Sequence, residues 1–351
     1  MAAAASDTRV AGTAVIGAGI VGAAVARALV RRGVPVTILE SNRPGHRLAS
    51  SKGDARIRVL AAYPDEEYLR LGIESDRIWK ELEVESGSRI LHPTGALSYG
   101  SLAERLAAAL DEKGVEHELL TRAGAARRAP GVSLPEEVEQ VLWQPDGATI
   151  AAEVGLSSML GAATARGAKL FSGQEVERVE EDAGTVVVQL PERELRFDRV
   201  VVVAGAWTAS LLGWEELNDL EPTAQTVSYF RLEGPPPPAL IDYDGAEPYS
   251  GWTPGFGLKS ADHQFGPVIE PGHLPDPDPA RVEATAAWVA ARFGLTGGAA
   301  MTETCVYTNT PDERIRIETK GKVTAVSACN GQGFQLAPAV GEMVAGQLLA
   351  G

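Results

Sequence analysis

The sequence predicts an α/β fold in which a Rossmann-like nucleotide-binding layer is assembled from separate stretches of the chain. An apolar strand at residues 13–16 leads through a glycine-rich turn into a helix. The stretch at 199–203 holds four consecutive valines after an arginine, which is typical of a parallel strand that is covered on both faces. Near the C-terminus, an apolar strand at 323–328 again runs into glycines and then a helix. Strand–glycine–helix units of this kind occur where a parallel sheet binds a nucleotide.

The composition restricts the class of partner. The 351 residues carry a formal net charge of −15, which argues against nucleic acid or an anionic membrane surface as a partner. Two cysteines are too few for a disulfide framework, so we expect a reducing, cytoplasmic setting. The first residues lack the basic region and long apolar run of a signal peptide, and the apolar run at 10–20 is too short to span a membrane.

The first glycine-rich turn has the spacing of a dinucleotide fingerprint. Gly17, Gly19 and Gly22 let the backbone approach a pyrophosphate, which would lie at the N-terminus of the helix that follows. The second strand, at 36–40, ends in Glu40, at the distance expected for a carboxylate that binds ribose. An unphosphorylated ribose is therefore favoured, hence FAD or NAD rather than NADP. The alternative is a tight turn without a ligand.

The remaining elements follow in order. The basic loop at 41–53 is either a cover over an anionic cofactor or a solvated loop. A helix is expected at about 65–83, and a second begins with a capping box of Ser101 and Glu104 and ends at Gly114. Further helices are expected to end near Gly167, to span 279–293 and to begin near Pro338. Strands are expected at 169–171, 175–180 and 185–190, whereas 115–146 is broken by proline and glycine and the composition changes over 221–279.

A stretch at 303–312 carries an unusual pair of side chains. If it is a strand, Cys305, Tyr307 and Asn309 point to one face. A thiol beside a phenol is an odd choice for a plain core, although most free cysteines are small buried hydrophobes. We expect a pocket where the nucleotide-binding layer meets the inserted β segments.

Taken in order, several motifs resemble the monomeric sarcosine oxidase family, which includes N-methyltryptophan oxidase and belongs to the glycine oxidase and D-amino acid oxidase group. The resemblance covers nearly the whole chain. It is carried by the fingerprint and by the segments Gly53-Asp54-Ala55-Arg56, Val203-Ala204-Gly205-Ala206-Trp207, Gly257-Leu258-Lys259 with His263, Cys305-Val306-Tyr307-Thr308 and Gly331-Gln332-Gly333-Phe334.

The resemblance implies a Rossmann-like FAD-binding domain with an inserted, mainly antiparallel β-sheet catalytic domain. We assign residues 1–86, 147–217 and 312–351 to the FAD-binding domain, and 87–146 and 218–311 to the catalytic domain. FAD is expected to be covalent, through a thioether on Cys305. The cofactor-binding residues implied in addition are Gly17, Gly19, Ile20, Gly22, Glu40, Ser41, Lys52, Val176, Gly205, Trp207, Gly331 and Gly333.

The resemblance also implies catalytic roles for Lys259, His263, Tyr307 and Arg56. The lysine would promote the reaction of reduced flavin with oxygen, because a fixed cation stabilises the negative charge that develops on O2. The histidine would orient the amine, and the tyrosine would lie beside the substrate. The structural alternatives are a surface lysine, a core histidine and aromatic packing. We assign no metal ligands, and Cys329 is interpreted as a core residue.

The chain departs from the family where the substrate carboxylate would bind. Val59 stands in place of an arginine and Gln335 in place of a lysine, so two cations are missing. Arg58 is one residue early, which on a strand puts it on the opposite face. The substrate pocket is nevertheless assigned to Gln335, Arg58 and Tyr249. An amide donates hydrogen bonds but brings no charge, so simple sarcosine is not the expected substrate.

The sequence thus predicts a monomeric FAD-dependent oxidase that converts a C–N bond of a secondary or cyclic amine, or of an imine, to C=N. Its partners would be a small-molecule amine and O2, with H2O2 as a product. Two alternatives stay open. One is an amine dehydrogenase that uses another electron acceptor, and the other is a non-catalytic nucleotide-binding relative.

Overall fold

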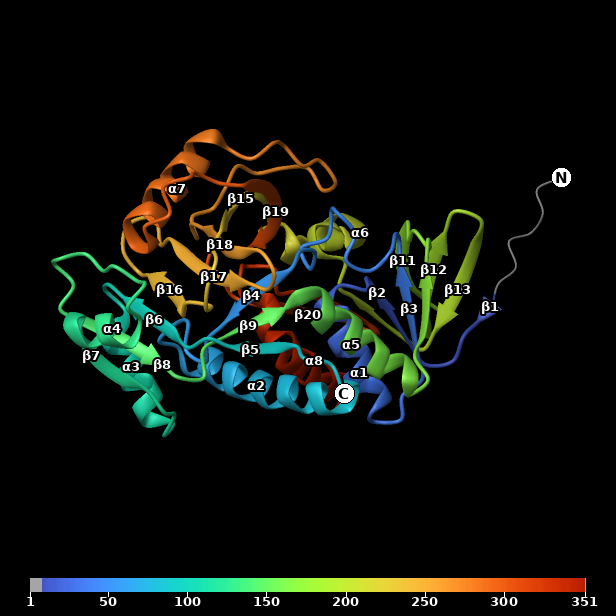
Figure 1. The fold of residues 1–351 in the computed structure, drawn as a ribbon. Coiled ribbons are helices and arrows are strands. Elements are labelled where there is room, and N and C mark those ends of the chain that lie inside the picture. Colours follow the sequence, from blue (N-terminus) through green and yellow to red (C-terminus); the bar gives the residue numbers. More distant parts are fainter. Residues whose placement is uncertain (1–7, 351) are drawn as a thin grey trace.

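The computed structural model describes residues 8–350 (Figure 1). The expectation that the chain starts without a signal peptide concerns in part residues 1–7, which lie outside the described residues. A six-stranded sheet has the order β10-β3-β2-β14-β21-β20, in which β20 alone pairs antiparallel. Its strands are β2 (Thr13–Ile16), β3 (Val36–Glu40), β10 (Lys169–Ser172), β14 (Arg199–Val202), β20 (Arg316–Lys320) and β21 (Val323–Ser327). The predicted parallel strands are confirmed.

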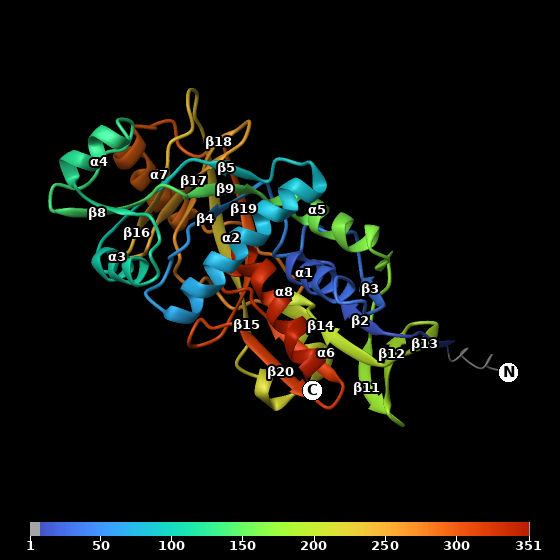
Figure 2. The same ribbon diagram turned by 90° about the horizontal axis from the view of Figure 1, so that it is seen from below.

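Both faces of this sheet are buried. Val15, Ile38 and Val201 pack against a helical layer, which Figure 2 shows from below. Alternate residues such as Ile16 and Val202 pack on the other face against a β meander. The helices are α1 (Ile20–Val30), α2 (Glu66–Ser86), α5 (Ala152–Ala165) and α8 (Gly333–Ala350). The meander strands are β11 (Arg178–Asp182), β12 (Thr185–Leu190) and β13 (Arg193–Phe197), and β1 (Thr8–Arg9) extends their sheet by pairing parallel with β13. Because side chains alternate along a strand, this double cover explains the continuous apolar runs.

A second, eight-stranded sheet has the order β19-β15-β18-β17-β16-β6-β8-β7 and is antiparallel except between β16 and β6. It comprises β6 (Ala96–Tyr99), β7 (Glu118–Thr121), β8 (Gln140–Gln144), β15 (Glu221–Arg231), β16 (Ala239–Asp242), β17 (Tyr249–Thr253), β18 (Gly257–Ala261) and β19 (Met301–Asn309). All eight strands fall within 87–146 and 218–311, and we keep the division into two domains as a proposal.

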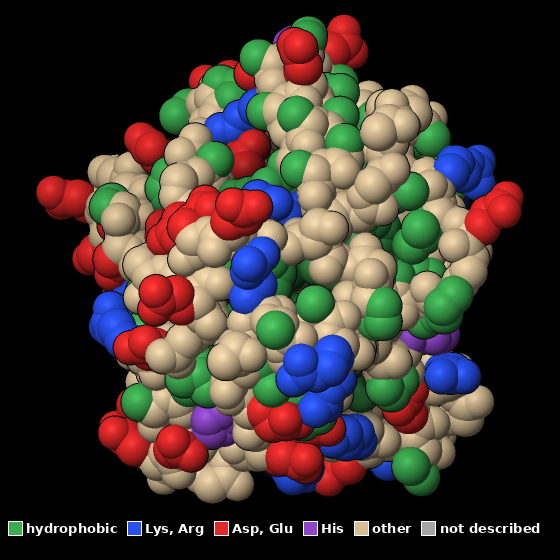
Figure 3. All heavy atoms as spheres, turned by 60° about the vertical axis from the view of Figure 1, so that its left-hand side comes forward, with side chains coloured by type: hydrophobic (Ala, Val, Ile, Leu, Met, Phe, Trp, Pro, Cys, Tyr) green, Lys and Arg blue, Asp and Glu red, His purple; other side chains and the backbone are tan. Residues whose placement is uncertain are grey.

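Smaller elements complete the second sheet's side of the molecule. Helices α3 (Ala103–Glu112), α4 (Arg122–Arg128) and α7 (Pro279–Phe293) flank the sheet, and α7 has the predicted bounds. A three-stranded sheet of β4 (Ala55–Arg58), β9 (Ala148–Ala151) and β5 (Leu91–Pro93) lies beside β17. On the face drawn in Figure 3, acidic and basic side chains are interspersed. Within residues 8–350, no helix has the length and apolar character that crossing a membrane requires.

Two predicted helix starts are wrong. Helix α3 has Leu102 at its N-cap, and no side chain bonds the cap, so the expected capping box of Ser101 and Glu104 does not form. The side chain of Ser101 instead bonds the loop after β16, because its Oγ donates to the carbonyl of Tyr243. Helix α8 begins at Gly333, five residues before the expected Pro338, which lies inside the helix.

Helix α2 explains how α8 continues through its proline, which removes a backbone donor. Trp79 Nε1 donates to the carbonyl of Gln335 at 3.0 Å. Ser75 Oγ donates to the carbonyl of Leu336 at 3.1 Å and accepts from the backbone N–H of Ala339 at 3.2 Å. Side chains of α2 thus satisfy backbone groups near the proline, and the first turn of α8 is fixed against the helical layer.

Two glycines of α8 give a matched test of the packing. A Cβ at Gly341 would lie 2.5 Å from the backbone carbon of Ala24 in α1, whereas a Cβ at Gly346 would meet no atom within 4 Å. We therefore expect Gly341→Ala to destabilise the fold by about 1–3 kcal/mol through overpacking. Gly346→Ala should stabilise it by about 0.5–1 kcal/mol, because alanine loses less entropy in a helix. Thermal unfolding measures both, and equal shifts would contradict the packing described.

Candidate active site

Two adjoining cavities lie where the layers meet. The larger, of about 480 Å³, surrounds the N-terminus of α1 at the ends of β2 and β3. The smaller, of about 170 Å³, lies between the helical layer and the eight-stranded sheet. Both are lined by residues that include Val21, Ser50, Ser51, Ala328 and Cys329. A ligand that filled the larger cavity could therefore extend into the smaller one.

The larger cavity contains nearly all the residues predicted to bind a nucleotide. Its lining includes Gly17, Gly19, Ile20, Gly22, Glu40, Ser41, Val176, Gly205 and Trp207. The turn requires its glycines. Gly17 has φ of +107° and a Cβ there would lie 2.4 Å from the carbonyl oxygen of Val203. A Cβ at Gly22 would lie 2.0 Å from the carbonyl oxygen of Gly17. The turn is thus packed tightly between β2, α1 and the segment after β14.

The carboxylate of Glu40 holds two backbone segments of the cavity wall in place. One oxygen accepts from the backbone N–H of Ala18 at 2.8 Å and the other from that of Asn42 at 2.9 Å. Ser51 Oγ accepts from the N–H of Ile20, at the start of α1, at 2.9 Å. The first turn of α1 is therefore bonded to the 41–53 loop, parts of which line the larger cavity.

Lys52, in the same loop, lines neither cavity and takes a different position from the one expected. Its Nζ donates to the carbonyl of Thr304 at 2.8 Å and lies 3.2 Å from the carboxylate of Glu303. Tyr229 donates to the same carboxylate at 2.5 Å. The lysine therefore ties the loop to β19 immediately before Cys305.

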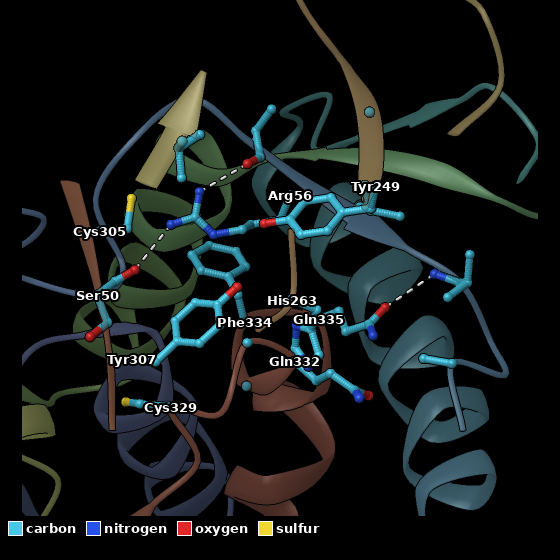
Figure 4. Close-up of a pocket in the computed structure, with 18 of the residues that line it drawn as sticks. Ser50, Arg56, Tyr249, His263, Cys305, Tyr307, Cys329, Gln332, Phe334 and Gln335 are labelled. Atoms are coloured by element: carbon cyan, nitrogen blue, oxygen red, sulfur yellow. Dashed lines mark hydrogen bonds between the residues drawn. The ribbon is translucent and has the colours of Figure 1, made fainter. Parts of the chain in front are cut away.

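The smaller cavity brings the predicted catalytic residues together. Arg56, Tyr249, Lys259, His263, Cys305, Tyr307, Gly331, Gly333 and Gln335 all line it. Figure 4 shows Cys305 and Tyr307 on the same side of the cavity, as their spacing on β19 requires, with Arg56 between Cys305 and Tyr249. These residues come from β4, β17, β18 and the loop after it, β19, the turn before α8 and the first turn of α8, so sequence-distant segments build one site.

Both cations of the smaller cavity are bonded to backbone carbonyls. The guanidinium of Arg56 donates to the carbonyls of Ala55, Ser50 and Lys52 at 2.9, 3.0 and 2.6 Å. Lys259 Nζ donates to the carbonyl of Ala55 at 3.2 Å. Burial, helped by the like charge of Arg56, lowers the pKa of Lys259 to about 8. The lysine is therefore held in place with a charge that titrates near neutral pH.

The two positions that depart from the family lie side by side. Gln335 Oε1 accepts from the backbone N–H of Val59 at 3.1 Å, so the amide is anchored at the cavity wall. Arg58 does not line the cavity, which corrects its assignment to the substrate pocket. It instead forms a buried ion pair with Asp76 of α2 at 3.0 Å, so its guanidinium lies toward the helical layer. Alternation along β4 is not the cause, because Arg56, two residues earlier, lines the cavity; the carboxylate of Asp76 holds Arg58 away from it.

A hydrogen-bonded group surrounds His263. The hydroxyl of Tyr63 lies 3.0 Å from His263 Nε2 and 3.1 Å from a carboxylate oxygen of Glu313. The hydrogen bond from His263 lowers the pKa of Glu313. A Cβ at Gly331 would lie 2.6 Å from the imidazole, so this glycine makes room for the ring. Sequence reasoning missed Tyr63 because it lies in a loop between β4 and α2 with no periodic pattern.

Cys329 is not a core residue, contrary to the prediction. It lines both cavities, because β21 ends at Ser327 and the chain turns toward the ligand side of the sheet before α8. Its carbonyl accepts from the backbone N–H of Thr308 at 2.9 Å, which joins this turn to β19. The sequence could have indicated this position, because Cys329 directly follows a predicted parallel strand and ligands bind at the carboxyl ends of such strands.

Comparisons with known proteins agree with this geometry. The pattern of the family DAO, FAD dependent oxidoreductase, matches residues 13–347. Monomeric sarcosine oxidase of Bacillus sp. (strain B-0618) is 29% identical over 346 residues, which cover 92% of this chain and 87% of that protein. N-methyl-L-tryptophan oxidase of Salmonella dublin is 25% identical over 333 residues, covering 90% of this chain and 88% of that protein.

Solved structures show the same fold. L-proline dehydrogenase from P. horikoshii superposes with a TM-score of 0.85 at 23% identity and covers 98% of this chain and 94% of that chain. NikD, an unusual amino acid oxidase essential for nikkomycin biosynthesis, has a TM-score of 0.81 at 24% identity, with 97% and 94% covered. Since the family pattern spans nearly the whole chain, the protein belongs to the DAO family of FAD-dependent oxidoreductases.

Proposed function

We propose that the protein is an oxidase that converts a C–N bond of a secondary or cyclic amine, or of a cyclic imine, to C=N. The observation that carries this proposal is the single cavity shared by Lys259, His263, Cys305 and Tyr307, beside a larger cavity built for a dinucleotide. The redox chemistry, in which two electrons pass from the amine to O2 and H2O2 is released, is supplied by FAD when it is bound.

The residues present fit FAD. At Gly17 and Gly22 there is no space for a side chain, and the backbone of this glycine turn can approach a pyrophosphate at the N-terminus of α1. Glu40 lines the same cavity with acceptor oxygens suited to a ribose. Cys305 lines the smaller cavity, where a thiol could hold the flavin end through a thioether. Lys259 lines the same cavity as Cys305, and Lys52 pairs with Glu303 two residues before it.

The chain's own residues would bind and orient the reactants. Lys259 would hold a positive charge where negative charge develops on oxygen. His263, fixed by Tyr63, would orient the amine by a hydrogen bond. Tyr307 would line the substrate side, and Arg56 would hold the 50–55 backbone in place through its three carbonyl contacts. Preorganised contacts of this kind cost no reorganisation during the reaction.

The substrate class follows from the charges that are absent at Val59 and Gln335. A carboxylate bound in this cavity would meet an amide and an apolar side chain in the place of two cations, and the guanidinium of Arg56 donates to three backbone carbonyls. We therefore propose a substrate whose affinity does not depend on a carboxylate next to the reacting nitrogen.

The proposed flavin tether predicts a simple colour test. Denaturing the holoenzyme in acid should leave the yellow colour with the polypeptide, whereas Cys305→Ser should release it to the supernatant. Cys329→Ser is the matched control, because Cys329 lines the same cavity, and its colour should stay bound. Colour lost from the unmodified protein, or retained by Cys305→Ser, would exclude the link.

The proposed role of Lys259 predicts a pH dependence of flavin reoxidation. The ammonium is present below its pKa of about 8, so the rate of reoxidation should fall as the pH rises through that value. Lys259→Met should reoxidise roughly 100-fold more slowly, with no such pH dependence, because one stabilising charge is removed.

Stopped-flow mixing of the anaerobically reduced enzyme with O2 isolates this step, and the rate of flavin reduction by an amine is its internal control. Equal slowing of reduction and reoxidation in Lys259→Met would contradict the assignment. Slow reoxidation of the unmodified enzyme would favour a dehydrogenase with another acceptor.

The missing cations predict poor use of sarcosine. Measured by H2O2 release, kcat/KM for sarcosine should lie far below that for the best amine in a panel of cyclic and acyclic amines. The variant Val59→Arg with Gln335→Lys should raise it at least about tenfold by restoring charge-assisted bonds to the carboxylate. Turnover of sarcosine by the unmodified enzyme at rates like those of good substrates would contradict this account.

A further inference from the structure

One carboxylate in the smaller cavity has no role in the arrangement described so far. Glu247 lines this cavity in the loop between β16 and β17 and is half-buried. Its φ is +50°, one of three positive values at non-glycine residues among those described. Unusual backbone conformations persist where the surrounding structure holds them, and they cluster at functional sites. Here the N–H of Glu247 donates to the carbonyl of Asp244, and the carbonyl of Ala246 accepts from the N–H of His263.

The neighbouring carboxylates already have partners, whereas that of Glu247 does not. Glu313 accepts from Tyr63 and pairs with His263 at 3.5 Å. Asp242 accepts from Tyr99 at 2.7 Å, and Asp244 accepts from the backbone N–H of Ser101 at 3.0 Å. Among the described residues, no hydrogen bond or ion pair reaches the carboxylate of Glu247. A half-buried charge without a partner is costly, and a cation bound in the cavity would offset that cost.

The electrostatic surroundings of Glu247 also favour a cation. Burial raises the pKa of its carboxyl, and the charges of Glu313, Asp242 and Asp244 act in the same direction, while His263 opposes them. Arg56 and Lys259 donate to backbone carbonyls of the 50–55 segment, and neither forms a hydrogen bond or ion pair with Glu247. This end of the cavity therefore carries more negative than positive charge.

Aromatic side chains line the same cavity. Tyr63, Tyr243, Tyr249 and Trp252 join Glu247 in its wall. The faces of aromatic rings attract cations, and aromatic walls combined with a carboxylate are a recurrent way to bind alkylammonium groups. The aromatic rings of the wall and its negative charge thus both favour a bound cation.

We infer that Glu247 binds a non-reacting cationic group of the substrate, so the substrate class is a diamine or polyamine rather than an amino acid. The ammonium would donate to the carboxylate of Glu247 and lie against the aromatic wall, while the other nitrogen lies toward Lys259 and Tyr307. This inference rests on the proposed amine oxidation, because it assigns the far end of the same substrate. It also gives a reason for the loss of cations at Val59 and Gln335, since a second positive charge would repel such a substrate.

The test compares three amines that differ at the far end alone: N-methylputrescine with an ammonium, N-methylpentylamine with a methyl, and N-methyl-γ-aminobutyrate with a carboxylate. Calorimetry on the holoenzyme, with its flavin kept reduced in oxygen-free buffer, measures Kd without turnover. N-methylputrescine should bind at least about tenfold more tightly than N-methyl-γ-aminobutyrate. Glu247→Gln should weaken N-methylputrescine about tenfold and leave N-methylpentylamine nearly unchanged.

Two further variants keep the test decisive. Glu247→Lys should reverse the order and favour N-methyl-γ-aminobutyrate, a gain that a folding defect cannot mimic. Glu283→Gln, on the exposed side of α7, removes the same net charge and should change nothing. Equal binding of the three amines, or equal weakening of all three by Glu247→Gln, would overturn the inference. If N-methylputrescine binds selectively but no amine reduces the oxidised flavin, the proposed oxidation fails and the binding site stands.

Discussion

The contact between α2 and the first turn of α8 is the constraint on which the site depends. Ser75 and Trp79 bond the backbone of α8 beside its internal proline, and the Trp79 ring stacks on Phe334 with centroids 6.0 Å apart. Gln335 in this turn and Gly331 just before it line the smaller cavity. The turn also follows Cys329, which lines both cavities. A displacement here would change three contacts together: the space that Gly331 leaves for His263, the hydrogen bond of Gln335 to the backbone of Val59, and the link between Cys329 and β19.

Charge is distributed unevenly along the smaller cavity. At one end, Lys259 and Arg56 are held by carbonyls of the 50–55 segment, and Lys52 joins that segment to β19. At the other end, Glu247 and Glu313 lie near His263. Interactions between charges are stronger in a cavity than in bulk water. On the proposed function, these charges would distinguish the two ends of a bound molecule, and hydrogen bonds and ion pairs hold most of them in place without a ligand.

The sequence was sufficient where local pattern and chemistry coincide. Strands β2, β3 and β14 and the glycine turn were predicted because periodicity and spacing determine them. The site residues on β18 and β19 were predicted through the resemblance to a known family, with spacing placing Cys305 and Tyr307 on one face. It failed where tertiary contacts decide. The start of α8 depends on Ser75 and Trp79, which are distant in sequence, and β15 lies in a region that was recognised by its composition alone. Glu247 and Tyr63 lie in loops, where no period indicates the direction of a side chain.

The cavities are built from residues between Ile16 and Gln335, contributed by both sheets and by the helical layer. No fragment of the chain can therefore present the binding surface by itself. A cofactor bound across these segments is lost when any of them opens, so its binding free energy opposes global unfolding and proteolysis alike. With a covalent bond at Cys305, that protection would no longer depend on the concentration of free flavin, and newly made chains would mature irreversibly from a labile to a durable form.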